Sequence, residues 1–181
     1  MTENEFKFVT CRSYAVLVNY TGHTADRIIV PCFYQGKPVK EIGAGVFYEH
    51  SEIKEVFLPY TVERIDVNAF GWTRQLRSVS IGDPEKEATA ICSIESYAFQ
   101  YSTLGQIELQ AKMIEIDDYA FANCSIKSIV MPTCIDLRVE DHAFSNSRLQ
   151  YIQAPLLSKG VISSIRELKK SKRRNSYNAN Y

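Results

Sequence analysis

Few residues of this 181-residue chain have the types and the spacing that catalysis or metal binding requires. The three histidines, His23, His50 and His142, lie far apart, and none has another His or Cys at the spacing of a metal site. The five cysteines include no pair with the two-residue spacing of zinc or redox motifs, so we expect reduced, mostly buried thiols. Neither a phosphate-cradling glycine loop nor a Gly-x-Ser-x-Gly motif occurs. We therefore expect no catalytic residue, no metal site and no cofactor, in a protein that is not an enzyme.

Acidic side chains are the exception, because they recur along the chain, each time directly after the same kind of apolar residue. Four of them directly follow an isoleucine or a valine that itself recurs, namely Asp66, Glu95, Asp117 and Glu140. A column of carboxylates could bind cations. Polar turn residues exposed to water give the same pattern, because buried unpaired acids are rare.

The residues that recur with a fixed period are apolar, and they predict the fold. The motif Ile-x-x-x-(Ala or Val)-Phe occupies residues 42–47, 65–70, 94–99 and 116–121, and Val replaces Ile at 139–144. Successive motif phenylalanines are 23, 29, 22 and 23 residues apart, within the period of leucine-rich repeats. The residue before each Phe is small, which suits a close approach of neighbouring turns. The motif therefore predicts stacked turns with a ladder of phenylalanines in the core.

A second apolar set begins five or six residues after each Phe and opens a short alternating run. In the run that contains Val56 and Leu58, alternation predicts a strand with one buried and one exposed face. Proline follows several runs, at residues 31, 59, 132 and 155, where a strand must stop donating hydrogen bonds. With one more strand at Ile28 and Val30, we predict about six short strands that stack in parallel into one sheet.

The stretch from Ile116 to Pro132, with Ala120, Phe121 and Cys124 in place, resembles the BspA-type (Treponema-type) leucine-rich repeat. The resemblance extends over about residues 14–155, although the cysteine place holds other residues elsewhere, namely His50, Thr73, Ser102 and Ser147. It implies a right-handed solenoid with the sheet on its concave side and irregular or short helical turns on its convex side. It also implies a non-catalytic role in adhesion or protein binding, in a family whose members are often surface or secreted proteins.

We class the fold as an α/β-type repeat solenoid and divide the chain into three parts. Residues 1–24 form an N-terminal capping segment, and residues 25–157 form the leucine-rich-repeat solenoid of about six turns. Residues 158–181 form a capping helix, predicted at 163–170, and a basic polar tail. An insertion at 82–89 lengthens one turn, either as a binding loop or as a tolerated surface insertion.

The alternation also identifies the side chains on the exposed face of the sheet, in two columns. The first column is Arg27, Glu55, Ser78, Gln106, Ser128 and Tyr151, and the second is Ile29, Phe57, Ser80, Glu108, Val130 and Gln153. Apolar anchors ringed by polar groups are typical of interface centres, although ordinary strand-favouring residues on a solvated sheet look the same. We predict that a partner protein contacts Arg27, Ile29, Glu55, Phe57, Gln106, Glu108, Val130, Tyr151 and Gln153.

Charge is unevenly divided along the chain. The 21 basic and 21 acidic residues cancel, but from Lys159 onward seven basic residues face one acidic residue, so the tail is +6 and the body −6. An acidic body argues against a broad nucleic-acid-binding face. The basic cluster that begins with Lys169 and ends with Arg174 could bind phosphates, and hence a nucleic acid weakly, or could serve as a nuclear address. A solvated terminus has the same composition. A further alternative is an adhesin-like unit that binds host matrix or carbohydrate.

The first residues carry acid where a secretory signal carries base, and no apolar run long enough to span a membrane occurs. We therefore expect a cytoplasmic protein, or a surface or secreted one if the chain is a fragment or leaves the cell by another route. Open strand edges also allow a homo-oligomer.

Overall fold

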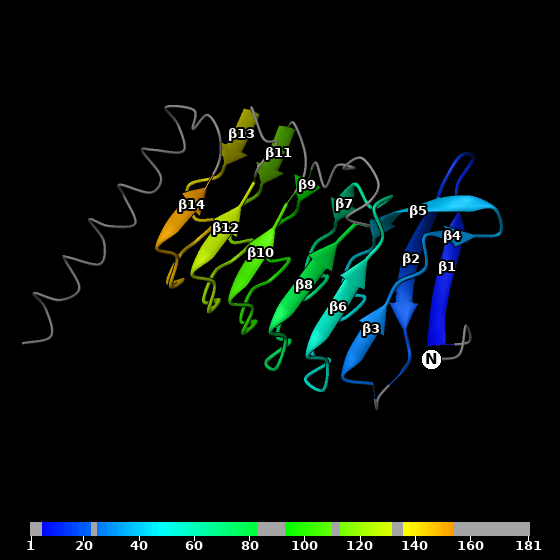
Figure 1. Ribbon diagram of the computed structural model, residues 1–181, viewed down its shortest axis with the longest axis horizontal. Coiled ribbons are helices and arrows are strands. Elements are labelled where there is room, and N and C mark those ends of the chain that lie inside the picture. Colours follow the sequence, from blue (N-terminus) through cyan, green and yellow to red (C-terminus); the bar gives the residue numbers. More distant parts are fainter. Residues whose placement is uncertain (1–4, 23–24, 83–92, 110–112, 132–135, 154–181) are drawn as a thin grey trace, which may run out of the picture.

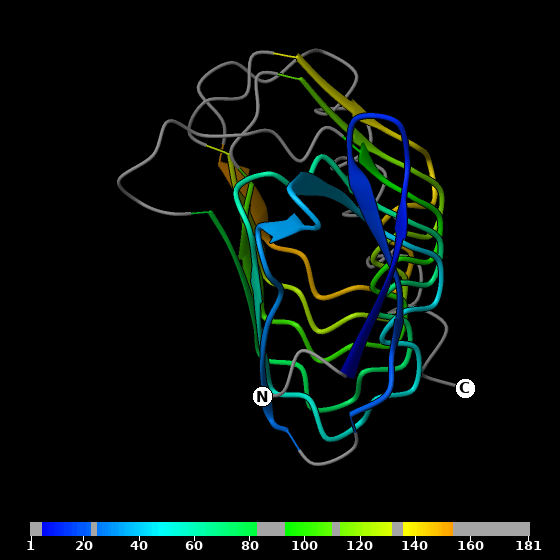
Figure 2. The ribbon, with the colours of Figure 1, turned by 90° about the vertical axis from the view of Figure 1, so that its right-hand side faces the viewer.

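The structure is a computed structural model that describes residues 5–22, 25–82, 93–109, 113–131 and 136–153. Within these ranges the chain winds into about five turns that stack along one axis (Figure 1). Successive turns superpose when viewed along that axis, with one sheet on each side of the solenoid (Figure 2). Among these residues no helix is long and apolar enough to cross a membrane.

A six-stranded parallel sheet lies where the alternating runs predict it. Each strand pairs with the strand of the next turn, and aliphatic side chains meet their counterparts: Val56 lies opposite Val79, and Ile107 lies opposite Ile129. The prediction of six strands is therefore confirmed. They are β3 (Arg27–Ile29), β6 (Glu55–Leu58), β8 (Ser78–Ile81), β10 (Gln106–Glu108), β12 (Ser128–Val130) and β14 (Tyr151–Gln153).

A second sheet lies on the side where the resemblance implied irregular or short helical turns, so that expectation was wrong. Its strands carry the first residue of each motif, and Ile42, Ile65 and Ile94 pair in register. Even two-residue strands form here, because each neighbouring turn offers backbone partners at the same height. The motif strands are β5 (Lys37–Ile42), β7 (Arg64–Ile65), β9 (Ser93–Ile94), β11 (Met113–Ile116) and β13 (Asp136–Val139), and β4 (Phe33–Tyr34) pairs antiparallel with β5.

Every regular element of the described residues is a strand, so this part of the chain is a β-solenoid and not an α/β-type fold. The predicted capping helix and the basic tail lie outside the described residues, as does the insertion after Gly82.

Tight turns that bond to one another replace helices between the two sheets. The backbone N–H of Phe47 donates to the carbonyl of Ala69, 2.8 Å away, and that of Phe121 donates to the carbonyl of Ala143, 2.7 Å away. In the first four motif turns the residues two before and two after the Phe have left-handed φ angles. Such residues interrupt a helix, so each turn stays compact and presents its small residue to the next turn. They are Gly45, Glu49, Asn68, Trp72, Tyr97, Tyr101, Tyr119 and Asn123.

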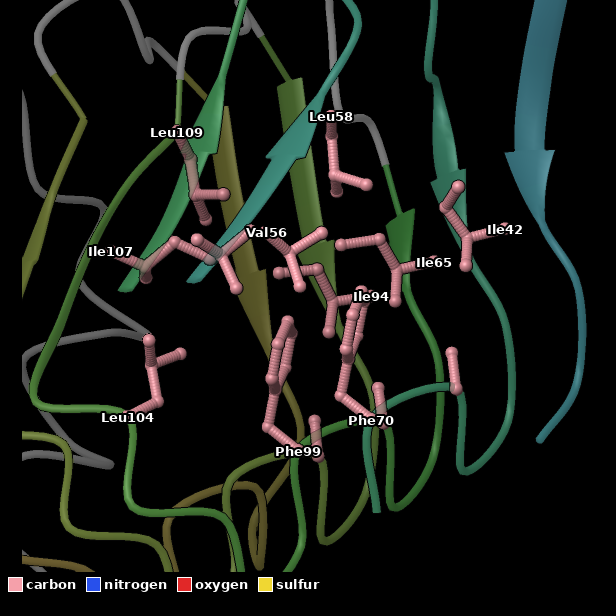
Figure 3. Close-up of a cluster of buried hydrophobic side chains, with 14 of the residues drawn as sticks. Ile42, Val56, Leu58, Ile65, Phe70, Ile94, Phe99, Leu104, Ile107 and Leu109 are labelled. Atoms are coloured by element: carbon pink, nitrogen blue, oxygen red, sulfur yellow. The ribbon is translucent and has the colours of Figure 1, made fainter. Parts of the chain in front are cut away.

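The five motif phenylalanines form a buried stack, the phenylalanine spine, as predicted. Their neighbouring ring centroids are 5.0, 5.0, 5.1 and 5.4 Å apart, with interplanar angles of 16°, 3°, 4° and 12°. Figure 3 shows Phe70 and Phe99 side by side, with Ile65, Ile94 and Val56 directed toward the same interior. Stacking converts residues that one turn could not bury into a continuous core. The spine consists of Phe47, Phe70, Phe99, Phe121 and Phe144.

An aromatic cluster closes the N-terminal end of this core. The antiparallel hairpin of β1 (Phe6–Thr10) and β2 (Ala15–Tyr20) joins the second sheet through β2 and β5. Tyr20 continues the spine, because its ring lies 5.5 Å from Phe47, and Phe6 packs on Tyr20 at 5.3 Å. Phe8 stacks on Tyr34 at 4.6 Å. We call Phe6, Phe8, Tyr20 and Tyr34 the aromatic cap.

The place that holds cysteine in the best-matching repeat is a buried polar position in four turns. Thr73 donates to the carbonyl of Phe70 at 2.7 Å. Ser102 Oγ and Cys124 Sγ lie 3.1 Å apart, and Cys124 also reaches the carbonyl of Leu104 at 3.6 Å. A small donor is therefore what the position requires, because a buried carbonyl needs a partner. This explains why Thr, Ser and Cys replace one another here.

We predict that Cys124 resists alkylation in the folded protein. Burial raises the pKa of its thiol, and the thiolate is the reactive form. Iodoacetamide at neutral pH followed by mass spectrometry is expected to modify the partly exposed Cys11 and Cys32 but to leave Cys124 unmodified until urea is added. Equal labelling of Cys124 and Cys32 in native buffer would contradict the assigned burial.

Candidate functional site

The outward face of the six-stranded sheet carries all nine residues predicted to contact a partner. Their side chains are exposed or half-buried, and the register aligns them in the two predicted columns: Arg27 pairs with Glu55, Ile29 with Phe57, and Val130 with Gln153. We call this surface, formed by the outward residues of β3, β6, β8, β10, β12 and β14, the sheet face. The strand register thus places these nine residues on one exposed face, and partner binding by them remains a prediction.

The N-terminal end of the sheet face is built around Arg27. Its guanidinium lies 4.5 Å from the centroid of the Phe57 ring, and its Nε lies 3.9 Å from Glu55 Oε2. Exposed contacts of these two kinds each contribute about 1 kcal/mol or less, so their main effect is to orient the arginine. Beside them Ile29 is 51% exposed. This end therefore combines an oriented cation with apolar area.

The C-terminal end of the sheet face has a different anchor. Tyr151 is 51% exposed, and the half-buried Val130 lies in the neighbouring column. Ser128 departs from the predicted exposed column, because it is buried between its larger register neighbours, Gln106 and Tyr151. Small and polar residues occupy the middle of the face.

The acidic row, which consists of Asp66, Glu95, Asp117 and Glu140, follows the strands of the second sheet, and the carboxylates of its first three members have partners. Arg64 lies 3.2 Å from Asp66 and 3.4 Å from Glu95. Asp117 accepts hydrogen bonds from the hydroxyl of Ser96 at 2.6 Å and from the backbone N–H of Asp118 at 2.8 Å. Among the described residues no group of three His, Cys, Asp or Glu side chains is placed to hold a metal ion. The ion pairs and hydrogen bonds of Asp66, Glu95 and Asp117 are those expected of polar turn residues.

A shallow cavity of about 290 Å³ adjoins the acidic row. Arg138 and Glu115, which both line it, form an ion pair at 3.1 Å, so one of the carboxylates that line the cavity is paired. The cavity is lined by Ser93, Glu95, Glu115, Ile116, Asp117, Arg138 and Glu140.

Two carboxyl groups on this side have shifted pKa values. Burial raises the pKa of Glu41, although Arg64 opposes the shift. The hydrogen bond from Ser96 lowers the pKa of Asp117, and the N–H of Asp118 adds to the effect. Glu41 is thus held closer to its neutral form, whereas Asp117 is held as a carboxylate.

We predict that Asp117→Asn destabilises the protein at neutral pH but not in strong acid. A carboxyl group with a lowered folded pKa stabilises the fold above its unfolded value of ~3.9 and loses this contribution as the pH falls through the folded value. Melting temperatures of the wild type and the variant are therefore expected to differ near neutral pH and to converge below ~pH 3. A difference independent of pH would show that the Ser96 contact does not depend on charge.

Two stacked parallel sheets around an aliphatic and phenylalanine core define the chain as a repeat solenoid of the leucine-rich-repeat class. Residues 92–165 carry BspA-type leucine-rich repeats, because they match the sequence model of the family described as "BspA type Leucine rich repeat region (6 copies)". The resemblance drawn from the motif residues is confirmed.

Solved structures agree with this class. A leucine-rich repeat protein of T. pallidum superposes with a TM-score of 0.70 at 20% identity, over 84% of this chain and 70% of that one. A leucine-rich cell surface protein of Faecalibacterium prausnitzii gives 0.54 at 20% identity over 85% of this chain, which spans about half (54%) of its length. A leucine-rich repeat protein of Bacteroides ovatus gives 0.58 at 21% identity, over 86% of this chain and 41% of that one. At these identities the likeness shows the fold alone. A comparison with curated protein sequences gave no match.

Sequence reasoning missed one surface, the edge where the turns lead into the six-stranded sheet. Trp72 and Tyr101 lie together there, with ring centroids 4.4 Å apart, and the Arg74 guanidinium lies 4.7 Å from the Trp72 ring. The signal that could have revealed it is the lack of acidic residues between the Phe and the following strand in four turns.

Proposed function

We propose that the protein is a non-catalytic binding module and that the sheet face docks a partner protein. The observation that carries this proposal is the in-register placement of two apolar anchors at opposite ends of one exposed sheet. Phe57 with Arg27 forms one anchor, Tyr151 forms the other, and polar side chains lie between them. Aromatic residues and arginine are the side chains in which binding energy concentrates.

The dimensions of the sheet face suit this role. Six strands about 4.8 Å apart extend on the order of 25 Å along the solenoid, which is the scale of a standard interface of about 800 Å² per partner. The face is held by backbone ladders on both sides of each inner strand, so binding would order few groups. Such preorganisation lowers the entropy cost of association.

Site-directed photocrosslinking tests the proposal. A photoreactive amino acid replaces Ser80, which is exposed in the middle of the sheet face, and a control variant carries it at Arg138, which is exposed on the second sheet. In the native host the Ser80 position is expected to yield a defined crosslinked protein that the Arg138 position does not. Equal crosslinking from both positions would argue against a specific face.

Charge insertion then separates the anchors from the rest of the surface. Phe57→Glu combined with Tyr151→Glu is expected to abolish the Ser80 crosslink, because each glutamate would be desolvated in the interface. Val9→Glu with Phe33→Glu is the matched control, since Val9 and Phe33 are also exposed apolar residues, 54% and 52% exposed, outside the sheet face. A partner retained by the first pair of substitutions would overturn the proposal.

A further inference from the structure

The edge where the turns enter the six-stranded sheet carries no acidic residue in the second to fifth motif turns, and it carries basic residues in the second, fourth and fifth. It comprises residues 72–77, 101–105, 123–127 and 146–150, and we call it the base edge. These segments contain no acidic residue. They contain four basic residues, all exposed, which are Arg74, Arg77, Lys127 and Arg148.

The carboxylates of the described residues lie elsewhere. In the first motif turn Glu49 and Glu52 occupy this edge, and Lys54 pairs with Asp26 at 3.3 Å. On the second sheet Asp66 and Glu95 pair with Arg64. Within the part of the chain that the structure describes, no carboxylate oxygen lies within the 4.0 Å of an ion pair from the four basic groups of the base edge. The base edge is therefore a locally positive surface on a body that is negative as a whole.

Backbone hydrogen bonds fix the spacing of these charges. The N–H of Lys127 donates to Gly105 at 2.8 Å, and the carbonyl of Lys127 accepts from Gln150 at 2.8 Å. The N–H of Arg148 donates to Cys124 at 3.4 Å. Because neighbouring turns are about 4.8 Å apart, the charges of the second to fifth turns extend over roughly 14 Å. Arg77 and Lys127 stand directly before a strand, whereas Arg74 and Arg148 each stand four residues after a spine phenylalanine, so the charges lie in two columns along the solenoid.

Two aromatic side chains share this edge at a conformational cost. Trp72 and Tyr101 have φ angles of 61° and 58°, and the equivalent residues of the next two turns are Asn123 and Asn146, at 54°. Asparagine adopts the left-handed region more readily than large side chains do. The two turns that hold the aromatic pair therefore keep a less favourable residue type. Residues strained in this way are often functional.

We infer that the base edge docks an acidic segment of a partner protein. Arginine pairs well with carboxylates, and Trp, Tyr and Arg dominate the binding energy of protein interfaces. Four charges neutralise few phosphates, so a nucleic acid would gain little here. Glu55 and Glu108 on the adjoining sheet face would also repel a phosphate backbone. The base edge borders the sheet face, because Arg77 and Lys127 directly precede β8 and β12, but it is a separate surface and binds independently of it.

Fluorescence anisotropy with a labelled peptide of alternating glutamate and tyrosine tests this inference on the full chain. We expect binding that weakens with salt, and no binding of the same peptide with lysine in place of glutamate. Arg74→Glu with Lys127→Glu is expected to weaken binding at least about tenfold. Lys7→Glu with Arg12→Glu changes the net charge equally at exposed residues of the N-terminal hairpin and is expected to change affinity less than about twofold.

A second double variant tests the aromatic residues without unfolding the chain. Trp72→Asn with Tyr101→Asn installs the residue that later turns use at the same φ, so the melting temperature is expected not to fall, while peptide binding is lost. Unchanged binding by this variant would remove the aromatic pair from the site.

Three outcomes would overturn the inference. The first is no binding of the acidic peptide, and the second is equal weakening by the Lys7 and Arg12 control. The third is tighter binding of oligothymidylate than of the peptide with the same dependence on Arg74 and Lys127, which would indicate a nucleic-acid site. Phe57→Glu with Tyr151→Glu is expected to retain the peptide, so a failure of the sheet-face proposal is distinguishable from a failure of this one.

Discussion

Phe121→Ala is expected to lower the free energy of unfolding by about 3–5 kcal/mol. The Phe121 side chain is fully buried and stacks on Phe99 at 5.1 Å and on Phe144 at 5.4 Å. Removing the ring leaves a cavity between two other rings, and the backbone bonds between turns prevent the gap from closing. Urea denaturation followed by circular dichroism measures the loss.

Phe33→Ala is the matched control, because it removes the same side-chain atoms outside the spine, from a residue that is 52% exposed. Its expected cost is below about 1 kcal/mol. A loss under about 1 kcal/mol for Phe121→Ala would contradict the role of the spine. Two separate unfolding transitions would indicate that the turns on either side of residue 121 have become uncoupled.

The phenylalanine spine and the six-stranded sheet could be predicted because both require particular side-chain types at regular positions. Each turn must bury one Phe and two strand aliphatics, so residue types repeat wherever the core repeats. Val56 and Leu58 alternate because a strand with one buried face has a period of two. The same alternation placed Arg27 and Phe57 in their correct columns on the sheet face.

The second sheet was not predicted, although the recurring Ile or Val of each motif lies in it, because its central strands β7 and β9 show no alternation. Arg64–Ile65 and Ser93–Ile94 are two residues long, too short for any alternation. Backbone bonds to neighbouring turns hold them, and such bonds do not depend on residue type. The left-handed turns were hidden for the same reason, since Trp72 and Tyr97 are not residues that usually indicate a positive φ.

Only part of the two proposed binding surfaces could be predicted from the sequence. Alternation gives the direction of a side chain, but not whether larger neighbours cover it, as happens to Ser128. The base edge was missed because charge was summed over the whole body. That sum of −6 combines the acidic row with the base edge, although the fold places the two on different sides of the solenoid.

Tyr20→Ala is expected to cost about 3–5 kcal/mol, because Tyr20 joins the aromatic cap to the spine. Its side chain is 2% exposed and contacts Phe6, Phe47 and His50, with ring centroids 5.2 to 5.5 Å away. Without this ring the hairpin loses its main contact with Phe47, so the N-terminal end of the core would open. Hydrogen exchange is expected to show faster exchange in β2 and β5 than in β12.

Tyr20→Phe separates the ring from the hydroxyl. The buried Tyr20 hydroxyl has no hydrogen-bond partner among the described residues, so its removal is expected to leave stability unchanged or to raise it by up to about 1 kcal/mol.

Burial also raises the pKa of Tyr20. A phenol with a raised folded pKa loses stability as the pH rises above its unfolded value of ~10, because the unfolded chain ionises first. The stability of Tyr20→Phe is therefore expected to exceed that of the wild type by a margin that grows above ~pH 10. A Tyr20→Phe variant less stable than the wild type at neutral pH would show that the hydroxyl is bonded, and that the aromatic cap depends on polar contacts as well as on ring packing.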